Sequence, residues 1–205
     1  MMISSVTLHA KSNPAAINRI ALLCSSRCPG TVIVHGLDVA IALKDAPISI
    51  VSGFQSPLEK ESLKFLLKGS VNLVVCPARS AIGMRIPAAW KKPMADGRLI
   101  IRSFIDETAS AKPGSTTKPT NGPRRPTIDL AERRNCFVAS ISDAVLILHA
   151  SAGGKLDRLA AELLDEGKQI WTLDDPANDN LLKKGVLTLT PDRLGPFLDS
   201  LPPAS

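Results

Sequence analysis

The chain has 205 residues, of which 44% are hydrophobic, and this amount of apolar material suits one globular domain with its own core. It carries 25 basic and 19 acidic residues, and the net charge of +6 permits a polyanionic partner without requiring one. Aromatic residues make up only 3%, which excludes a nucleic-acid binder that relies mainly on stacking bases against aromatic rings.

The sequence predicts no association with a membrane. No apolar run approaches the roughly 18 residues of a membrane-spanning helix, and the first residues lack the basic start and long apolar core of a secretory signal. We therefore expect a cytoplasmic protein.

The four cysteines, Cys24, Cys28, Cys76 and Cys136, are expected to be reduced thiols. Cys24 and Cys28 are separated by three residues, but no second Cys or His pair completes a zinc site. We predict no metal and no cofactor.

The first half of the chain alternates apolar strands with helical patterns. Strands are predicted over 20–24, 48–52, 71–76 and 98–101, and helices over 31–45 and 57–68. Pro57 suits the first turn of the second helix, and Gly69 suits its C-terminal end.

The second half repeats this alternation more clearly. Strands are predicted over 143–149, 169–173 and 186–189, and a helix with one apolar stripe follows Gly154. Continuously apolar strands that alternate with helices indicate a parallel sheet covered on both faces. The expected fold is therefore α/β and Rossmann-like, with a mostly parallel sheet.

We divide the chain into an N-terminal extension (1–19), a Rossmann-like domain (20–190) and a C-terminal tail (191–205). Within the domain, residues 108–127 have four prolines and no acid, which predicts a flexible basic loop. Either this loop is a tolerated surface insertion, or it is an electrostatic arm toward nucleic acid. Its basic residues are Lys112, Lys118, Arg124 and Arg125.

Small and polar residues follow three of the predicted strands directly. Because the carboxyl ends of parallel strands share one edge of the sheet, we expect these turns to form one phosphate-binding site with free backbone N–H groups. The glycine-rich turn lacks the sequence of an ATPase P-loop, so ATP hydrolysis is not expected. The residues of the three turns are Ser25, Ser26 and Arg27; Ser52 and Gly53; and Gly153, Gly154 and Lys155.

Arg134 occupies an unusual position in a helical pattern. It lies four residues after Leu130 and three before Phe137, on the apolar side of the predicted helix. An arginine there needs either a structural ion pair or an anion in a cleft. We predict that Arg134 and its neighbour Asn135 belong to the phosphate site.

Taken together, these segments resemble the DNA-processing protein A (Smf) family of the wider SLOG superfamily, over roughly residues 20 to 190. The matching runs are Leu23–Arg27, Ser52–Glu59, Arg134–Ser142, His149–Ala150 with Gly154–Leu156, and Asp179–Val186. Departures include Cys24 in place of a glycine, Pro57-Leu58-Glu59 in place of Gly-Ile-Asp, and Cys136 in place of a second arginine.

The resemblance implies a Rossmann-like core that binds single-stranded DNA and helps to load a RecA-type recombinase, as a homodimer and without catalysis. An alternative is a SLOG-type protein that binds or senses a nucleotide or nucleotide derivative. A third hypothesis is that the chain is a phosphoribohydrolase of the cytokinin-activating type. It is disfavoured because Gly153-Gly154-Lys155-Leu156-Asp157 lacks the threonine and the glutamate of that signature.

Overall fold

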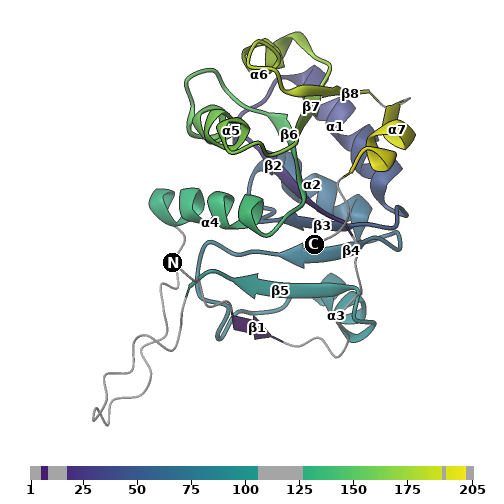
Figure 1. The fold of residues 1–205 in the computed structure, drawn as a ribbon. Coiled ribbons are helices and arrows are strands. Elements are labelled where there is room, and N and C mark those ends of the chain that lie inside the picture. Colours follow the sequence, from purple (N-terminus) through teal and green to yellow (C-terminus); the bar gives the residue numbers. More distant parts are fainter. Residues whose placement is uncertain (1–5, 9–17, 106–126, 191–192, 202–205) are drawn as a thin grey trace.

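The computed structural model describes residues 6–8, 18–105, 127–190 and 193–201. These residues form an eight-stranded sheet in the order β1-β5-β4-β3-β2-β6-β7-β8 (Figure 1). Strands β2 to β8 pair with one another in the parallel direction, and β1 pairs with β5 in the antiparallel direction. The predicted α/β fold with a mostly parallel sheet is confirmed.

The elements alternate along the chain as the hydrophobic patterns predict. The strands are β1 (Val6–Leu8), β2 (Arg19–Cys24), β3 (Ser49–Ser52), β4 (Asn72–Val75), β5 (Leu99–Ser103), β6 (Ala144–His149), β7 (Ile170–Leu173) and β8 (Leu187–Leu189). The helices are α1 (Gly30–Leu43), α2 (Pro57–Leu66), α3 (Ala88–Ala95), α4 (Ile128–Ser140), α5 (Lys155–Asp165), α6 (Asp179–Leu182) and α7 (Leu194–Asp199), and a 3-10 turn, Pro176–Asn178, precedes α6.

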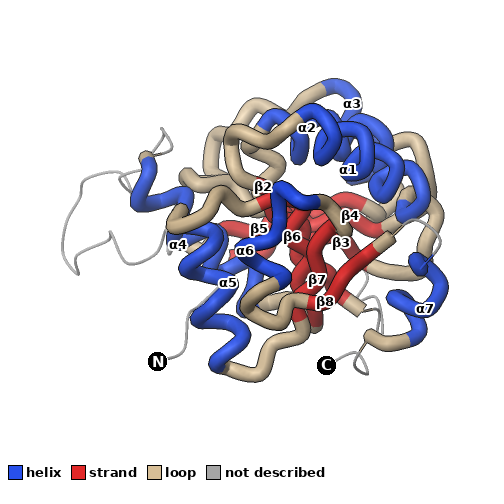
Figure 2. Tube along the Cα trace, turned by 90° about the horizontal axis from the view of Figure 1, so that it is seen from above, coloured by secondary structure: helices blue, strands red, loops and turns tan. Residues whose placement is uncertain are grey.

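Helices cover both faces of the sheet (Figure 2). The side chains of α1, α2, α3 and α7 pack on one face, and those of α4 and α5 pack on the other. Successive residues of β2 alternate between the two cores, since Ile20 and Leu22 face the first and Ala21 and Leu23 face the second. This explains why the central strands are apolar throughout.

One strand and two α-helices were not predicted from the sequence. Strand β1 comes from the segment that we treated as an N-terminal extension, and it forms an edge of the sheet. Helix α3 contains Pro93 and has only a weak apolar pattern, so the hydrophobic periodicity of the sequence did not reveal it. Helix α6 is a single turn, too short for a periodic signal.

The basic residues Lys112, Lys118, Arg124 and Arg125 lie outside the described residues, so the two readings of their loop stay open. Within the described ranges, no helix is long and apolar enough to cross a membrane.

Candidate phosphate-binding site

The order in which successive strands join the sheet reverses at β2. Strands β3, β4 and β5 follow on one side of β2, whereas β6, β7 and β8 lie on the other. In open α/β sheets such a switch point opens a crevice outside the carboxyl ends of the two strands, where ligands bind. The β2–β6 register also shifts between Leu23 and Cys24, where the two strands end at this crevice.

The loops that follow β2 and β6 are hydrogen-bonded to each other. The backbone N–H of Ser25 donates to the carbonyl of His149 (2.9 Å), and the Ser25 hydroxyl accepts from the backbone N–H of Ser151 (3.2 Å). Ser26 and Arg27 stand beyond this link and are exposed. Within the described part of the chain, Arg27 makes neither a hydrogen bond nor an ion pair, so its guanidinium is available to a ligand.

The glycine-rich loop after β6 is held in place from below by Asp157. One carboxylate oxygen of Asp157 accepts from the backbone N–H of Gly153 (2.9 Å), and the other contacts Asn180 Nδ2 (2.7 Å) and Lys184 Nζ. Burial alone would raise the pKa of Asp157, but the hydrogen bonds from Lys184, Gly153 and Asn180 lower it below its usual value. This carboxylate is therefore ionised and structural.

Both glycines of this loop are required by its geometry. Gly153 has φ +68, in the left-handed region that favours glycine. A Cβ atom on Gly154 would stand 2.8 Å from the carbonyl oxygen of Ser151. Asn180 also donates to the carbonyl of Ala150 (3.1 Å) and so ties α6 to the same loop.

Lys155 does not project freely into the crevice. Its ammonium forms an ion pair with Glu132 of α4, and both side chains are about half exposed. Lys155, which we predicted to contact phosphate, therefore already has an acidic partner. In this structure its ion pair connects α4 to the start of α5.

The turn after β3 meets α4 in an unusually close contact. A Cβ atom on Gly53 would stand only 1.2 Å from Nη1 of Arg134, so any other residue at this position would displace that guanidinium. Ser52 is fully buried, and its hydroxyl accepts from the backbone N–H of Phe54 (3.0 Å). Phe54 itself has φ +47, a conformation that L residues rarely adopt and that often accompanies functional sites.

Arg134 is 4% exposed and incompletely paired. Its Nε donates to Asn135 Oδ1 (2.8 Å), but its Nη1 is buried without a hydrogen-bond partner. Burial lowers the pKa of Arg134, while the negative charge of nearby Glu59 acts in the opposite direction. Arg134 makes no ion pair with any described residue. Of the two alternatives given for this arginine, the described residues therefore do not supply the structural ion pair.

Glu59 was missed as a site residue, and it links β2 to the start of α2. Its carboxylate accepts from the backbone N–H groups of Cys24 (2.9 Å), Gln55 (2.8 Å) and Ser56 (3.2 Å), and it is 2% exposed. The Ser56 hydroxyl accepts from the backbone N–H of Glu59 in return, which completes a capping box. The spacing from Ser56 to Glu59 was the sequence signal that could have revealed this role.

A second buried polar group lies where β6 and β7 end. Asn178 donates from Nδ2 to the carbonyls of Leu148 (3.0 Å) and Leu173 (3.3 Å), so its Oδ1 faces Nδ1 of His149 (2.9 Å). This fixes a proton on Nδ1 of His149. Asp175 lies nearby, and its pKa is lowered chiefly by the hydrogen bond from the backbone N–H of Ala177. Nothing in the sequence pattern indicated this group.

The described residues contain no group of three His, Cys, Asp or Glu side chains arranged to hold a metal ion. All four cysteines are free thiols. Burial raises the pKa of Cys76 to about 12, and burial also raises the pKa values of Cys24 and Cys28. These thiols are therefore poor nucleophiles.

The sequence matches no family model and no curated protein, but the fold matches solved structures. DNA processing protein A from Helicobacter pylori, described for its single-stranded DNA binding mode, has a TM-score of 0.67 at 15% identity, with 98% of each chain covered. The protein of the same name from Streptococcus pneumoniae gives 0.63 at 16% identity. The chain has the fold of DNA processing protein A.

The match with the Streptococcus pneumoniae protein covers 87% of this chain but only 61% of that protein, less than two thirds of its length. The same fold also occurs in the molybdenum cofactor binding protein from Rippkaea orientalis, with a TM-score of 0.60 at 12% identity, over 91% of this chain and 98% of that one. The fold shared with DNA processing protein A therefore does not by itself select the ligand.

Proposed function

We propose that the chain binds single-stranded DNA and acts in DNA processing, with the phosphate backbone as the main group recognised. The observation that carries this proposal is the buried Nη1 of Arg134, which lies against Gly53 without a hydrogen-bond partner. A buried guanidinium nitrogen without a hydrogen-bond acceptor is costly, and an anionic ligand would supply the acceptor that Nη1 lacks.

A second phosphate contact is supported by the loops at the switch point. Helices α1 and α5 both begin there, and neither has a side chain that caps its first N–H groups. Uncapped N–H groups at a helix start, together with the positive end of the helix dipole, favour an anion. The exposed Arg27 would add a guanidinium to the same crevice.

The proposed DNA-contacting residues are therefore Ser25, Ser26, Arg27, Ser52, Gly53, Arg134, Asn135, Gly153 and Gly154, with Lys155 in a lesser role because Glu132 already pairs with it. We extend the proposal to a homodimer that cooperates with a RecA-type recombinase, on the resemblance in motifs and fold. We assign no catalytic residue.

Fluorescence anisotropy with single-stranded DNA, double-stranded DNA and free nucleotides across a salt series tests the proposal. Single strands should bind best, with little preference for sequence and a log–log salt slope of about 0.7 per neutralised phosphate. Arg27→Ala should weaken binding by roughly 10- to 150-fold, which corresponds to the about 1.5–3 kcal/mol of a hydrogen bond to a charged group. Arg124→Ala and Arg125→Ala should only weaken affinity slightly and flatten the slope.

Two results would contradict this assignment. Loss of binding in the Arg124 and Arg125 variants, with normal binding by a folded Arg27→Ala, would move the contact from the crevice to the basic loop. A flat salt response would argue against phosphate recognition altogether.

A second candidate function is the binding of a small nucleotide derivative. It is favoured by the fold match to a molybdenum cofactor binding protein and by the hydrogen bonds that join the loops after β2 and β6. Tight binding of a free nucleotide with weak binding of oligonucleotides would support this alternative.

A further inference from the structure

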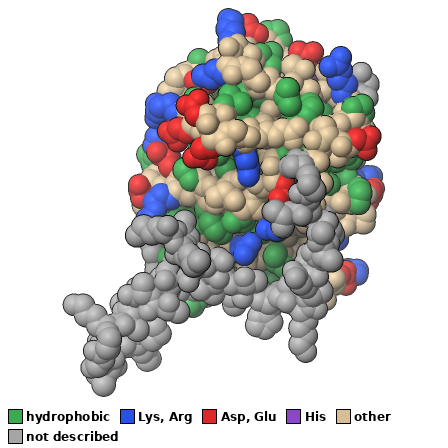
Figure 3. All heavy atoms as spheres, viewed as in Figure 1, with side chains coloured by type: hydrophobic (Ala, Val, Ile, Leu, Met, Phe, Trp, Pro, Cys, Tyr) green, Lys and Arg blue, Asp and Glu red, His purple; other side chains and the backbone are tan. Residues whose placement is uncertain are grey.

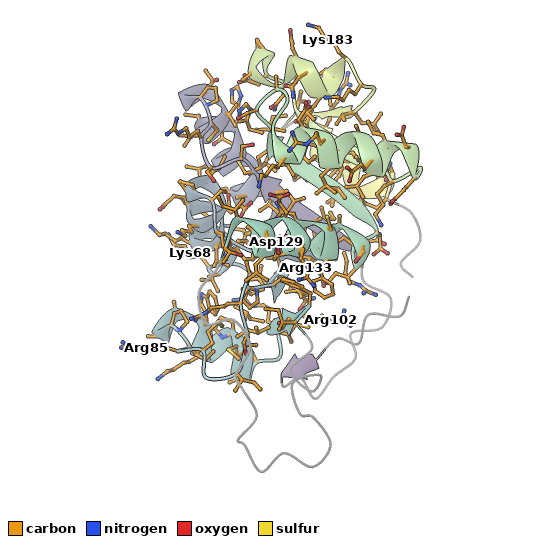
Figure 4. The ribbon with its side chains drawn as sticks, turned by 90° about the vertical axis from the view of Figure 1, so that its left-hand side faces the viewer. Lys68, Arg85, Arg102, Asp129, Arg133 and Lys183 are labelled. Atoms are coloured by element: carbon orange, nitrogen blue, oxygen red, sulfur yellow. The ribbon has the colours of Figure 1, made fainter. Side chains whose placement is uncertain are left out.

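The charge of the molecule is distributed unevenly. The segment from α2 to the start of β5, residues 57–98, holds eight basic and three acidic residues, a net charge of +5. The segment from α5 to β8, residues 155–190, holds five basic and seven acidic residues, a net charge of −2. Figure 3 shows acidic side chains gathered on the face where α5 lies. In Figure 4, Lys68 and Arg85 project from one side of the molecule and Lys183 stands at the far end.

Part of the positive charge forms a row along α2. Lys60, Lys64 and Lys68 are all exposed and recur every fourth residue, so they lie on one side of the helix and of the turn that follows it. At 1.5 Å per residue the row is about 12 Å long. Lys64 is paired with Glu61 of the same helix (2.7 Å), and Lys68 Nζ stands 5.1 Å from the centre of the Phe65 ring.

The row connects the candidate phosphate site to the opposite edge of the sheet. Helix α2 begins at Pro57, directly after the turn that holds Gly53 beside Arg134. Its end leads into the amino end of β4, where a cavity of about 690 Å³ opens. The residues with polar groups on the cavity wall include Lys68, Ser70, Asn72, Lys92, Asp96 and Arg98.

The cavity has a fixed cation in its wall. The Arg98 guanidinium donates to the carbonyls of Leu67 (2.9 Å), Val71 (3.0 Å) and Leu66 (3.4 Å), which hold it in place. Within the described residues no carboxylate pairs with Arg98, so these carbonyl dipoles are its partners and its full positive charge still acts on an anion in the cavity. By contrast, Lys92 is paired with Asp96 (2.7 Å).

We infer that the lysine row of α2 and the amino-edge cavity form a second contact surface, for the phosphate backbone of a single strand that leaves the carboxyl-edge site. This inference rests on the proposed function. The surface is continuous with Gly53 and Arg134 at one end, and at the other end it has Arg98, which no described carboxylate pairs with. This arrangement favours a DNA strand that continues from the first site. It favours an acidic protein segment that binds separately less. Lysines act here as point charges, so the surface adds affinity without reading sequence.

Oligonucleotides of different length test this surface on the full chain. We would measure a single strand of about 4 nucleotides and one of about 16, the range of site sizes in single-strand binding modules, across a salt series. The triple variant Lys60→Gln, Lys64→Gln, Lys68→Gln should bind the short strand normally. It should bind the long strand more weakly, with a salt slope smaller by about 2, since each lost phosphate contact removes about 0.7.

Lys64→Gln alone should reduce the long-strand slope by at most about 0.7, because the exposed pair with Glu61 has to open before Lys64 contacts a phosphate. Its matched control is Lys183→Gln, because Lys183 is also an exposed helix lysine near an acid of its own helix, Asp179 (3.8 Å), but lies on the acidic segment. The control should change nothing.

An unchanged long-strand slope in the triple variant would overturn the second surface and leave the first site intact. Equal loss for both lengths would also overturn it, because the lysines would then belong to the first site. If competition by polyglutamate matched that by long DNA, the surface would be assigned to an acidic protein instead. If neither length of DNA binds the native chain, the proposed function and this inference fail together.

Discussion

The two glycine turns at the carboxyl edge of the sheet are built in opposite ways. The loop after β6 rests on Asp157, whose oxygens are satisfied by Gly153, Asn180 and Lys184. The turn after β3 is pressed against Arg134, whose Nη1 has no partner. A satisfied buried network is a scaffold, whereas an unsatisfied buried donor is a place where a ligand can complete the structure. The comparison predicts that changes at the first turn affect stability and that changes at the second affect binding.

The largest effect is expected for Gly53→Ala. The added Cβ would overlap Nη1 of Arg134, so the guanidinium must move and the DNA site is lost. We expect affinity for single-stranded DNA to fall at least about 100-fold and stability to fall by about 1–3 kcal/mol, the usual cost of overpacking. Anisotropy and urea unfolding measure the two effects. Gly195→Ala is the control, since nothing lies within 4 Å of its added Cβ. Normal binding by a folded Gly53→Ala would refute the contact.

Arg134→Met should separate binding from stability. Methionine keeps most of the apolar contact of the side chain but removes a buried, incompletely paired charge, so the melting temperature should stay level or rise. Binding should weaken roughly 10- to 150-fold, because the charged donor is worth about 1.5–3 kcal/mol. Thermal melts and anisotropy on the same sample check this. A loss of more than about 2 kcal/mol of stability with unchanged affinity would show that Arg134 has a structural role only.

Asp157→Asn should reduce stability much more than binding. It weakens hydrogen bonds to a carboxylate, so we expect a loss of about 2 kcal/mol in stability at neutral pH and only a few-fold loss in binding. The pKa of Asp157 is lowered in the folded state, so its stabilisation is present above about pH 4, the pKa range of an unfolded aspartate, and is lost as the pH falls through the folded value. Unfolding at several pH values should show the two proteins converging in acid. A constant difference across that range would contradict the assignment.

The smallest effect is expected for Lys155→Ala. Its ion pair with Glu132 is about half exposed, so its loss should cost under about 1 kcal/mol of stability. Because Glu132 already neutralises this ammonium, the affinity for single-stranded DNA should fall less than about threefold, well below the effect of Arg27→Ala. A large loss on Lys155→Ala would show that DNA displaces Glu132 from the lysine.

Much of the architecture could be predicted from local patterns. The apolar strands Arg19–Cys24 and Ala144–His149 and the striped helix Lys155–Asp165 were predicted within one or two residues. Arg134 could be singled out because its place on an apolar stripe is unusual for a charged residue. The predicted turn residues of the site follow β2, β3 and β6, and β2 lies between the other two strands, so their loops adjoin.

The missed features have two causes. Helix α3 contains Pro93 and α6 is one turn long, so neither has the periodicity that identifies a helix. Asn178 and His149 meet across 29 positions of the sequence, and their pairing depends on β6 and β7 being neighbours. Local patterns do not encode which strands are adjacent.

The sequence by itself determined that the chain alternates buried strands with amphipathic helices, because burial on two faces requires continuously apolar strands. It also determined which turns contain small residues and that Arg134 needs a partner. Only the tertiary structure decided that Nη1 of Arg134 finds no acceptor among the described residues, because it places Gly53 of a distant turn against the guanidinium. It likewise decided that Lys155 meets Glu132 and that Asp157 supports Gly153. The physical reason is that these contacts depend on strand order and helix placement, which are set by how the whole chain packs.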